Sequence, residues 1–395
     1  MGVTYPKGFL ASGISAGIKA GGKKDLALVL SEETAVSAGV ATTNKFKAAS
    51  LLLSLKHLHH KTHRAILINS GNANAVNGKE GIVITQRLVT DLASILKVKP
   101  EEVLFASTGK IGHVLPEDKI KKAFPELVKN LSTDGHPAAE AILTTDLKIK
   151  EISLETGIEG RKGLVRIGGM AKGAGMIKPE LATMLVILTT DAVIEKEALQ
   201  LALHEAVKES FNLITVDDDQ STNDFVVILA NGNAGNHRIK TGTQPFFLFQ
   251  ENLRDACQQL ARSLVADGEG AQKLIIVRVT GAWSKKDANR VARRIAGSNL
   301  VKTTVAGNNP NWGRILAAAG SCAARIKPEK ASLSLAKTLV FDQGEPISFP
   351  EEALAKKIQK PEVEIELDLG IGNFSATSYG CDLTEEYVKI NKSYS

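Results

Sequence analysis

The sequence contains little cysteine, which limits its redox and zinc chemistry. Its 395 residues include three cysteines, Cys257, Cys322 and Cys381. Their number is odd, their spacing is wide, and no Cys-x-x-Cys pair occurs, so structural disulfides and zinc sites of paired cysteines are both disfavoured. Three separate thiols fit a reducing compartment, and we expect a cytoplasmic protein.

Long apolar runs, a leader peptide and a block of like charge are also missing. No stretch approaches the roughly 18 apolar residues that a membrane span needs, and residues 1–8 lack the charged-then-apolar pattern of a secretion signal. The net charge of +6 is spread along the chain, which gives little support to nucleic-acid binding. We therefore expect no membrane span and no nucleic-acid partner. The mildly basic balance favours anionic small-molecule substrates.

Internal repeats, low-complexity tracts and disordered linkers are absent too, so the sequence marks no domain boundary. With 43% hydrophobic and 23% charged residues, the composition is that of a globular protein with a large core. Strand-like and helical runs alternate along the chain. Strands are expected at 65–69, 103–107, 164–167, 183–189, 225–230, 274–279, 339–342 and 363–369. Helices are expected at 81–96, 117–131, 196–209, 246–265, 286–296, 315–324 and 351–358.

Two helix starts carry capping chemistry, and several strands are apolar throughout. A proline followed by two acidic residues stands at 116–118 and again at 350–352, which is typical of a first helical turn. The run 185–188 is continuously apolar, as is usual for strands covered on both faces. These patterns predict an α/β fold in which helices lie outside layered sheets.

The most informative segment is a glycine-rich turn that leads into an apolar strand. Residues 168–176 read GGMAKGAGM, and residues 179–185 read PELATML. Glycines permit positive φ and close packing, and Pro179 keeps the chain extended before Thr183. If the Ala182–Thr183 bond were cut, Thr183 would carry a free α-amine beside its hydroxyl, the nucleophile and base of N-terminal threonine enzymes. The alternative interpretation is an ordinary first residue of a strand.

This segment resembles the self-cleaving region of the ornithine acetyltransferases, or glutamate N-acetyltransferases, of arginine biosynthesis. That family reads approximately GGMAKGAGMIxPxxATML here. The resemblance continues, in family order, over nearly the whole chain. Further matching motifs are PKGF at 6–9, TTN at 42–44, NSGNAN at 69–74, STG at 107–109, TTD at 144–146, STND at 221–224, DGEGA at 267–271 and PNWGR at 310–314.

The resemblance implies both a fold and a processing event. The fold is a layered αββα-type sandwich of the kind found in self-processing ornithine acetyltransferases and N-terminal-nucleophile aminopeptidases. Cleavage at Ala182–Thr183 would yield an alpha chain of residues 1–182 and a beta chain of residues 183–395, with strands of both chains sharing sheets. An α2β2 heterotetramer of the cleaved chains is implied as well.

The implied reaction moves acetyl from N2-acetyl-L-ornithine to L-glutamate through an acetyl ester on Thr183. The α-amine of Thr183 acts as the base, since its reference pKa of about 7.7–8.0 leaves a useful neutral fraction at cytosolic pH. Attack of the same hydroxyl on the carbonyl of Ala182 accounts for self-cleavage without a protease.

No cofactor is implied, and two questions about the reaction stay open. Acetyl-CoA is a possible second acetyl donor, which would add amino-acid N-acetyltransferase activity. The net positive charge of the chain slightly favours this anionic donor. The alternative function is an aminopeptidase or amidase of the related N-terminal-nucleophile fold, in which water replaces the amine acceptor.

The resemblance assigns the oxyanion hole to Thr108 and the backbone N–H of Gly109. These residues follow an apolar strand, and acyl transfer needs donors aimed at the developing oxyanion. A plain turn is the alternative. A phosphate loop does not fit, because Leu104 and Ile111 stand where that motif requires glycine and serine or threonine.

The implied substrate contacts come from both halves of the chain. Lys172 can meet a carboxylate as a point charge, and Glu269 can accept an ammonium. For each of these charges, the alternative is a solvated surface side chain. The full set of implied contacts is Thr144 or Thr145, Lys172, Thr183, Glu269, Asn391 and Ser395.

Two further clusters suggest a metal, but we assign none. The carboxylates of 217–219 and Asp224 cannot readily converge, because adjacent residues of a strand point to opposite faces, and a loop role is expected. His59 and His63 have a spacing that suits a metal. Because lysines are interleaved among the histidines of 57–63, a solvated basic surface is expected there.

The sequence departs from the family pattern at several positions. Lys178 and Glu180 stand where smaller, apolar or amide residues are usual, which questions the rate of self-cleavage. Asp218 replaces a usual glycine, which questions a turn. The chain ends one residue earlier than is typical, so whether Ser395 replaces the usual last contact is open.

Overall fold

The computed structural model describes residues 1–178 and 184–393, which divide into two units. The predicted cleavage residues Ala182 and Thr183, together with Glu180 and Ser395, lie outside the described residues. Among the described residues, the first unit comprises 1–173, 184–211 and 220–261, and the second comprises 174–178, 212–219 and 262–393.

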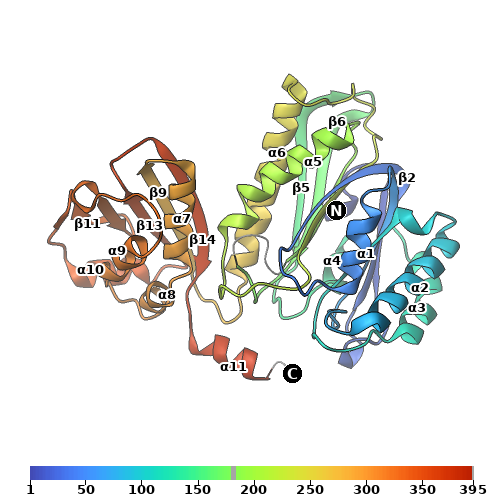
Figure 1. The fold of residues 1–395 in the computed structure, drawn as a ribbon, viewed down its shortest axis with the longest axis horizontal. Helices are drawn as coiled ribbons and strands as arrows, with labels where there is room; N and C mark the ends of the chain where they lie inside the picture. The colour runs from blue at the N-terminus through green and yellow to red at the C-terminus, as the bar shows by residue number, and fades with distance from the viewer. Residues whose placement is uncertain (179–183, 394–395) are drawn as a thin grey trace. The chain divides into compact units, whose positions relative to one another are not determined.

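Strands from both sides of residue 183 build one sheet in the first unit (Figure 1). The described residues form eight strands in the order β4-β3-β2-β8-β7-β6-β5, with β1 paired to β2. β7 and β8 follow residue 183 in the chain, yet they lie between β2 and β6, which precede it. The sheet sharing expected from the sequence is therefore present. The bounds are β1 (Phe9–Ile14), β2 (Leu26–Ala41), β3 (His63–Asn69), β4 (Val103–Ser107), β5 (Lys150–Gly160), β6 (Gly163–Lys172), β7 (Leu185–Thr190) and β8 (Phe225–Ala230).

A buried core lies between the two halves of this sheet. β2 changes its partner partway along, because residues 26–30 pair with β3 whereas residues 36–41 pair with β8. Successive residues of a strand point to opposite faces. Ile66 of β3, Ile187 of β7 and Val227 of β8 all face the same core, although they belong to different halves.

Helices cover the outer faces of the two halves. Leu88 of α2 and Phe124 of α3 pack against Phe105 of β4. On the other half, the side-chain amide of Gln200 in α5 exchanges two hydrogen bonds of 3.2 Å with the backbone of Gly39 in β2. The order of helices, sheet, core, sheet and helices confirms the predicted layered α/β sandwich. The helices are α1 (Ala49–His57), α2 (Gly78–Leu96), α3 (Glu117–Lys129), α4 (His136–Ala141), α5 (Lys196–Lys208) and α6 (Gln244–Ala266), the last of which extends into the second unit.

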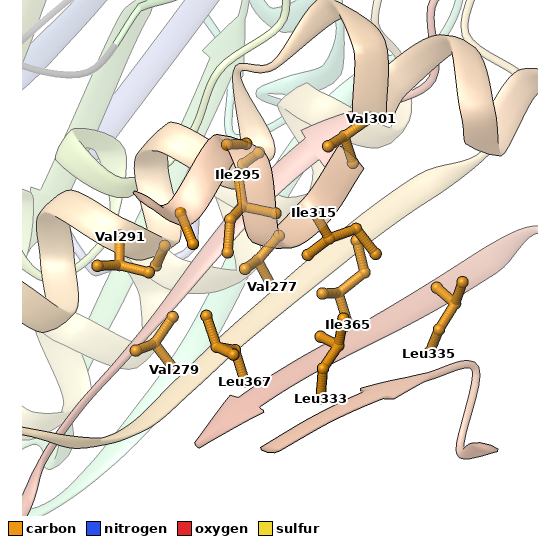
Figure 2. Packing of buried hydrophobic residues seen from close by; sticks show 14 of the residues in the cluster. Val277, Val279, Val291, Ile295, Val301, Ile315, Leu333, Leu335, Ile365 and Leu367 are labelled. Carbon is orange, nitrogen blue, oxygen red and sulfur yellow. The ribbon is translucent and has the colours of Figure 1, made fainter. Parts of the chain in front are cut away.

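The second unit has its own sheet and its own core. Its described strands run in the order β12-β11-β10-β13-β9-β14. Figure 2 shows Val277 of β9 and Ile365 of β13 packed with Ile295 of α7 and Ile315 of α9. The bounds are β9 (Leu274–Ala282), α7 (Lys285–Ala296), α8 (Asn299–Ala306), α9 (Gly313–Gly320), β10 (Ser332–Leu335), β11 (Thr338–Asp342), β12 (Glu345–Pro346), α10 (Glu351–Ile358), β13 (Glu362–Asp368), β14 (Phe374–Cys381) and α11 (Glu385–Ser393).

The predicted elements match where the sequence pattern is strong. β4, β8 and α10 have the predicted bounds, and α3 begins at Glu117 with Pro116 as its N-cap. The sequence pattern predicts no strand where β1, β2 and β14 lie. Serine, glycine and glutamate interrupt these segments, so their strand conformation depends on pairing within the sheet rather than on local preference. No described helix is both long enough and apolar enough to cross a lipid bilayer.

The central position of β7 generates a stability prediction. Ile187 is fully buried in the core between the two halves, so we expect Ile187→Ala to reduce the free energy of unfolding by about 2–5 kcal/mol. Ile82 in α2 is 40% exposed, and Ile82→Ala should change stability by no more than about 0.5 kcal/mol. Urea unfolding followed by circular dichroism measures both, and equal losses would contradict the assigned core.

Candidate active site

The two predicted oxyanion residues lie at the end of the buried strand β4. The backbone N–H of Thr108 donates to the carbonyl of Asn69 at 3.0 Å. Gly109 has φ of +132°, and a Cβ there would lie 2.3 Å from the backbone carbon of Gly71, so the turn requires glycine. No residue that the structure describes accepts a hydrogen bond from the Gly109 N–H. This turn therefore presents an unused backbone donor.

Lys172, the last residue of β6, reaches the same turn. Its Nζ donates to Thr108 Oγ1 at 3.2 Å and lies 3.9 Å from Asp146 Oδ2. The residue is only 3% exposed. The alternative of a solvated surface charge is therefore wrong for Lys172, whose ammonium lies in the interior beside the predicted oxyanion hole.

Asp146 connects the residues around this lysine. Its Oδ1 accepts from Lys150 Nζ and from the Gly173 N–H, both at 2.7 Å, and its Oδ2 accepts from the Thr144 N–H at 3.1 Å. Burial raises the pKa of Asp146, but the charges of Lys172 and Lys150 and the bonds from Lys150 and Gly173 outweigh it, lowering the pKa to about 2. Asp146 is therefore an ionised carboxylate that orders both the 144–146 loop and the end of β6.

Three lysines lie near Thr108. Lys172 and Lys150 both interact with the carboxylate of Asp146. Lys19 is a third lysine close by, and burial lowers its pKa to about 8, with Asp25 opposing this shift and the charge of Lys172 adding to it. These positive charges favour an anionic group, such as a substrate carboxylate or a developing oxyanion.

A small pocket lies beside the residue that follows Thr183 in the chain. Asp224 fixes Met184 there, because its Oδ1 accepts from the Met184 N–H at 2.7 Å. Complete burial raises the pKa of Asp224 well above its usual range. Asn223 donates to the carbonyls of Ala73 and Ser107 at 2.6 and 2.7 Å. These bonds connect the segment just before β8 to the turn after β4. The pocket is lined by Thr108, Lys172, Met184, Leu185, Ser221, Asn223 and Asp224.

Two predicted substrate residues meet in the second unit. Asn391 Nδ2, on α11, donates to Glu269 Oε2 at 2.8 Å. The Glu269 N–H donates to the carbonyl of Ala174 at 2.8 Å, and a Cβ on Gly175 would lie 2.4 Å from the Glu269 carboxylate. Gly175 thus allows the close approach of the Glu269 carboxylate to the glycine-rich motif.

A second carboxylate fixes the segment just upstream of residue 179. Asp217 accepts from the N–H groups of Met176 and Ile177 at 2.5 and 2.9 Å and from the Tyr387 hydroxyl at 3.2 Å. Burial raises the pKa of Asp217, with these backbone bonds opposing the shift. Asp218 has φ of +65°, the left-handed region that favours glycine. Both aspartates therefore have a structural role in a loop, as expected from the sequence.

The histidine segment differs from its prediction. His57 and His63 are buried, and His63 bonds to Ser37 Oγ at 2.8 Å and to the carbonyl of His57 at 3.0 Å. Burial lowers the pKa of His63 to about 4. The expectation of a solvated basic surface is wrong for these two residues, because β3 begins at His63 and places its side chain inside, whereas His59 is exposed.

The structure groups some of the predicted residues and reveals others. Thr108, Gly109, Thr144, Thr145 and Lys172 lie in the first unit, and Glu269 and Asn391 lie in the second. The predicted nucleophile Thr183, the preceding Ala182 and the terminal Ser395 lie outside the described residues. Sequence reasoning assigned no role to Asp146, Lys150 or Lys19, and it expected only a loop role for Asp224. Asp146 and Asp224 belong to the TTD and STND motifs, and these motifs could have drawn attention to them. No local sequence pattern, however, shows that the two side chains are buried.

Comparisons with known proteins agree along the whole chain. A family profile described as "ArgJ family" matches residues 10–395. The chain is 47% identical to an arginine biosynthesis bifunctional protein ArgJ of Dehalococcoides mccartyi, over 99% of this chain and 96% of that protein. It is 46% identical to the protein of the same name from Symbiobacterium thermophilum, over 100% and 98%. The crystal structure of arginine biosynthesis bifunctional protein ArgJ from Bacillus halodurans is 41% identical, with a TM-score of 0.51, and covers 53% of this chain and 98% of that chain.

The lowered pKa of Asp146 generates a pH prediction. In the folded protein the pKa of Asp146 is about 2, below its ordinary value of 3.8. The ionised carboxylate therefore stabilises the fold above pH 3.8, and that contribution is lost as pH falls through 2. Asp146→Asn should therefore be less stable than wild type at pH 5, with the difference shrinking as pH falls toward 2. Thermal unfolding across this range measures it. Asp255→Asn, on the exposed side of α6, is the control, and a difference for Asp146→Asn that stays constant with pH would contradict the assignment.

Proposed function

The chain belongs to the ArgJ family and is an acyltransferase of arginine biosynthesis, and we propose that it moves acetyl from N2-acetyl-L-ornithine to L-glutamate through an acetyl ester on Thr183. The observation that carries this proposal is the donor pair at Thr108 and Gly109. Thr108 of this turn and Met184, the residue directly after Thr183, line the same small pocket. Donors beside a nucleophile are what acyl transfer requires.

The reaction proceeds in two balanced halves. In the first, the Thr183 hydroxyl attacks the acetyl carbonyl, its proton passes to the α-amine, and ornithine leaves after accepting a proton. In the second, the amine of glutamate attacks the acetyl ester, and the threonine hydroxyl is restored. The Thr108 hydroxyl and the Gly109 N–H stabilise the oxyanion in both halves.

The amino-acid substrates are recognised by opposite charges. Lys172 meets the carboxylate, since its ammonium lies beside Thr108 with Lys150 and Lys19 near by. Glu269 accepts an ammonium, with Asn391 hydrogen-bonded to its carboxylate. Thr144 or Thr145 adds a further contact, and Asp146 holds the backbone of Thr144. Ser395 is proposed as the last contact at the C-terminus.

The nucleophile is released by self-cleavage between Ala182 and Thr183. Carboxylates hold the chain on both sides of this bond. Upstream, Asp217 accepts hydrogen bonds from the N–H groups of Met176 and Ile177. Downstream, Asp224 accepts one from the N–H of Met184. The solved Bacillus halodurans chain supports cleavage, because nearly all of it corresponds to about half of this chain, as a fragment like 183–395 would. The cleaved chains are proposed to assemble as a cytoplasmic α2β2 heterotetramer.

Self-cleavage is tested at the nucleophile itself. We expect wild-type protein to separate under denaturing conditions into fragments 1–182 and 183–395, which stay together in native buffer because β7 and β8 lie between strands of the other fragment. Thr183→Ala should remain one chain and transfer no acetyl, whereas Thr183→Ser keeps a hydroxyl and should still be cleaved. Intact mass distinguishes these species, and a processed Thr183→Ala protein would exclude the proposed chemistry.

The donor range is tested with acetyl-CoA. The relatives carry the word "bifunctional" in their names, and the net charge of +6 suits a polyphosphate donor, so we propose that acetyl-CoA also acetylates Thr183. Glutamate acetylation is measured with acetyl-CoA as sole donor, beside the N-acetylornithine reaction, and should exceed the Thr183→Ala background. Activity equal to that background would make the enzyme monofunctional. Failure of both reactions, with release of free acetate from amide substrates, would indicate the amidase alternative.

A further inference from the structure

We infer that Asp146 and Lys172 act as a positioning pair that orients and strengthens the Thr108 hydroxyl as an oxyanion donor, in self-cleavage as well as in acetyl transfer. This inference rests on the proposed function, because it deepens the role of the Thr108–Gly109 turn. It gives Lys172 a task that does not depend on a bound amino acid.

The direction of the hydrogen bond to Thr108 follows from the chemistry of lysine. An ammonium has three donors and no acceptor, so the 3.2 Å contact makes Thr108 Oγ1 the acceptor. The hydroxyl hydrogen must then point away from Lys172. No described residue accepts it, and Thr108 lines the pocket beside Met184. The hydrogen is therefore available to an oxyanion formed next to residue 183.

The charge of Lys172 also strengthens that donor. A hydroxyl that accepts a bond from a cation is polarised, and it donates more strongly through its own hydrogen. The effect is large where water is excluded, and Lys172 is 3% exposed.

Asp146 keeps this lysine charged and in place. A buried lysine without a counter-charge tends to lose its proton, and Asp146 Oδ2 lies 3.9 Å from the Lys172 ammonium. The carboxylate is itself fixed by the N–H groups of Thr144 and Gly173. Because Gly173 directly follows Lys172, the same carboxylate holds both the backbone next to Lys172 and the Lys172 ammonium in place.

Self-cleavage separates this task from substrate binding. A lysine that only binds the carboxylate of an amino acid has no part in the attack of Thr183 on Ala182, since no amino-acid substrate is involved. A lysine that acts through Thr108 affects both reactions.

The experiment combines Lys172→Met and Thr108→Ala in a double-mutant cycle. Self-cleavage is followed as loss of the full-length chain after pulse synthesis, and acetyl transfer is followed as kcat and KM for glutamate. Thr108→Ala should lower kcat by about 10²–10³. Lys172→Met should slow self-cleavage and lower kcat in the wild-type background. In the Thr108→Ala background it should change neither further, and only the KM for glutamate should rise.

Lys150→Met is the matched control. Lys150 is as buried as Lys172 and binds the same carboxylate, but its hydrogen bonds go to Asp146 and to the carbonyl of Lys148. We expect Lys150→Met to lower the unfolding temperature without slowing self-cleavage as Lys172→Met does. Asp146→Asn should slow both reactions, and its effect on kcat should vanish in the Lys172→Met background, because it acts through that lysine.

Three results would overturn the inference. The first is Lys172→Met protein with wild-type self-cleavage and kcat and only a raised KM, which leaves the lysine as a carboxylate binder. The second is independent, multiplicative losses in the double variant. The third is equal slowing by Lys150→Met, which makes the effect structural. Each differs from failure of the proposed function, which would appear as a wild-type protein that shows no cleavage and no transfer dependent on Thr183.

Discussion

The arrangement around the predicted oxyanion hole depends on one buried carboxylate between two buried lysines. Asp146 binds Lys150 at 2.7 Å, lies 3.9 Å from Lys172, and accepts the backbone N–H groups of Thr144 and Gly173. Removing a buried charge from its partners is costly, so each of these contacts adds to the stability of the group. The loop that carries Thr144, the end of β6 and the ammonium beside Thr108 are therefore fixed by a single electrostatic constraint.

A second constraint concerns the chain on either side of the proposed cleavage bond. Met176 and Ile177 donate to Asp217, and Met184 donates to Asp224. Burial raises the pKa of both carboxyl groups. Holding a segment by its backbone N–H groups leaves its side chains free to vary, which agrees with the unusual Lys178 in this sequence. Lys178 is exposed and lies 3.7 Å from Asp218.

The sheet of the first unit explains how a cut chain can remain one protein. β7 and β8 are flanked by β2 and β6, so their backbone hydrogen bonds run to strands on the other side of residue 183. All residues of β7 and β8 are buried, and the core that they form with β3 and β4 lies inside the same unit. Separating the fragments would expose this core and open two strand ladders at once.

The sequence by itself determined the elements with strong patterns, such as β4, β8 and α10, and it singled out Thr108, Gly109, Lys172 and Glu269 through their motifs. Local chemistry suffices there, because apolar runs, capping residues and required glycines act within a few positions of the chain. Tertiary structure alone decided that β1, β2 and β14 are strands, that His63 is buried and neutral, and that Lys172 faces Thr108 rather than water. It also decided the roles of Asp146 and Asp224. The reason is physical: burial and charge pairing arise between segments far apart in the chain, so the pKa and the partner of a side chain are fixed only when distant strands meet.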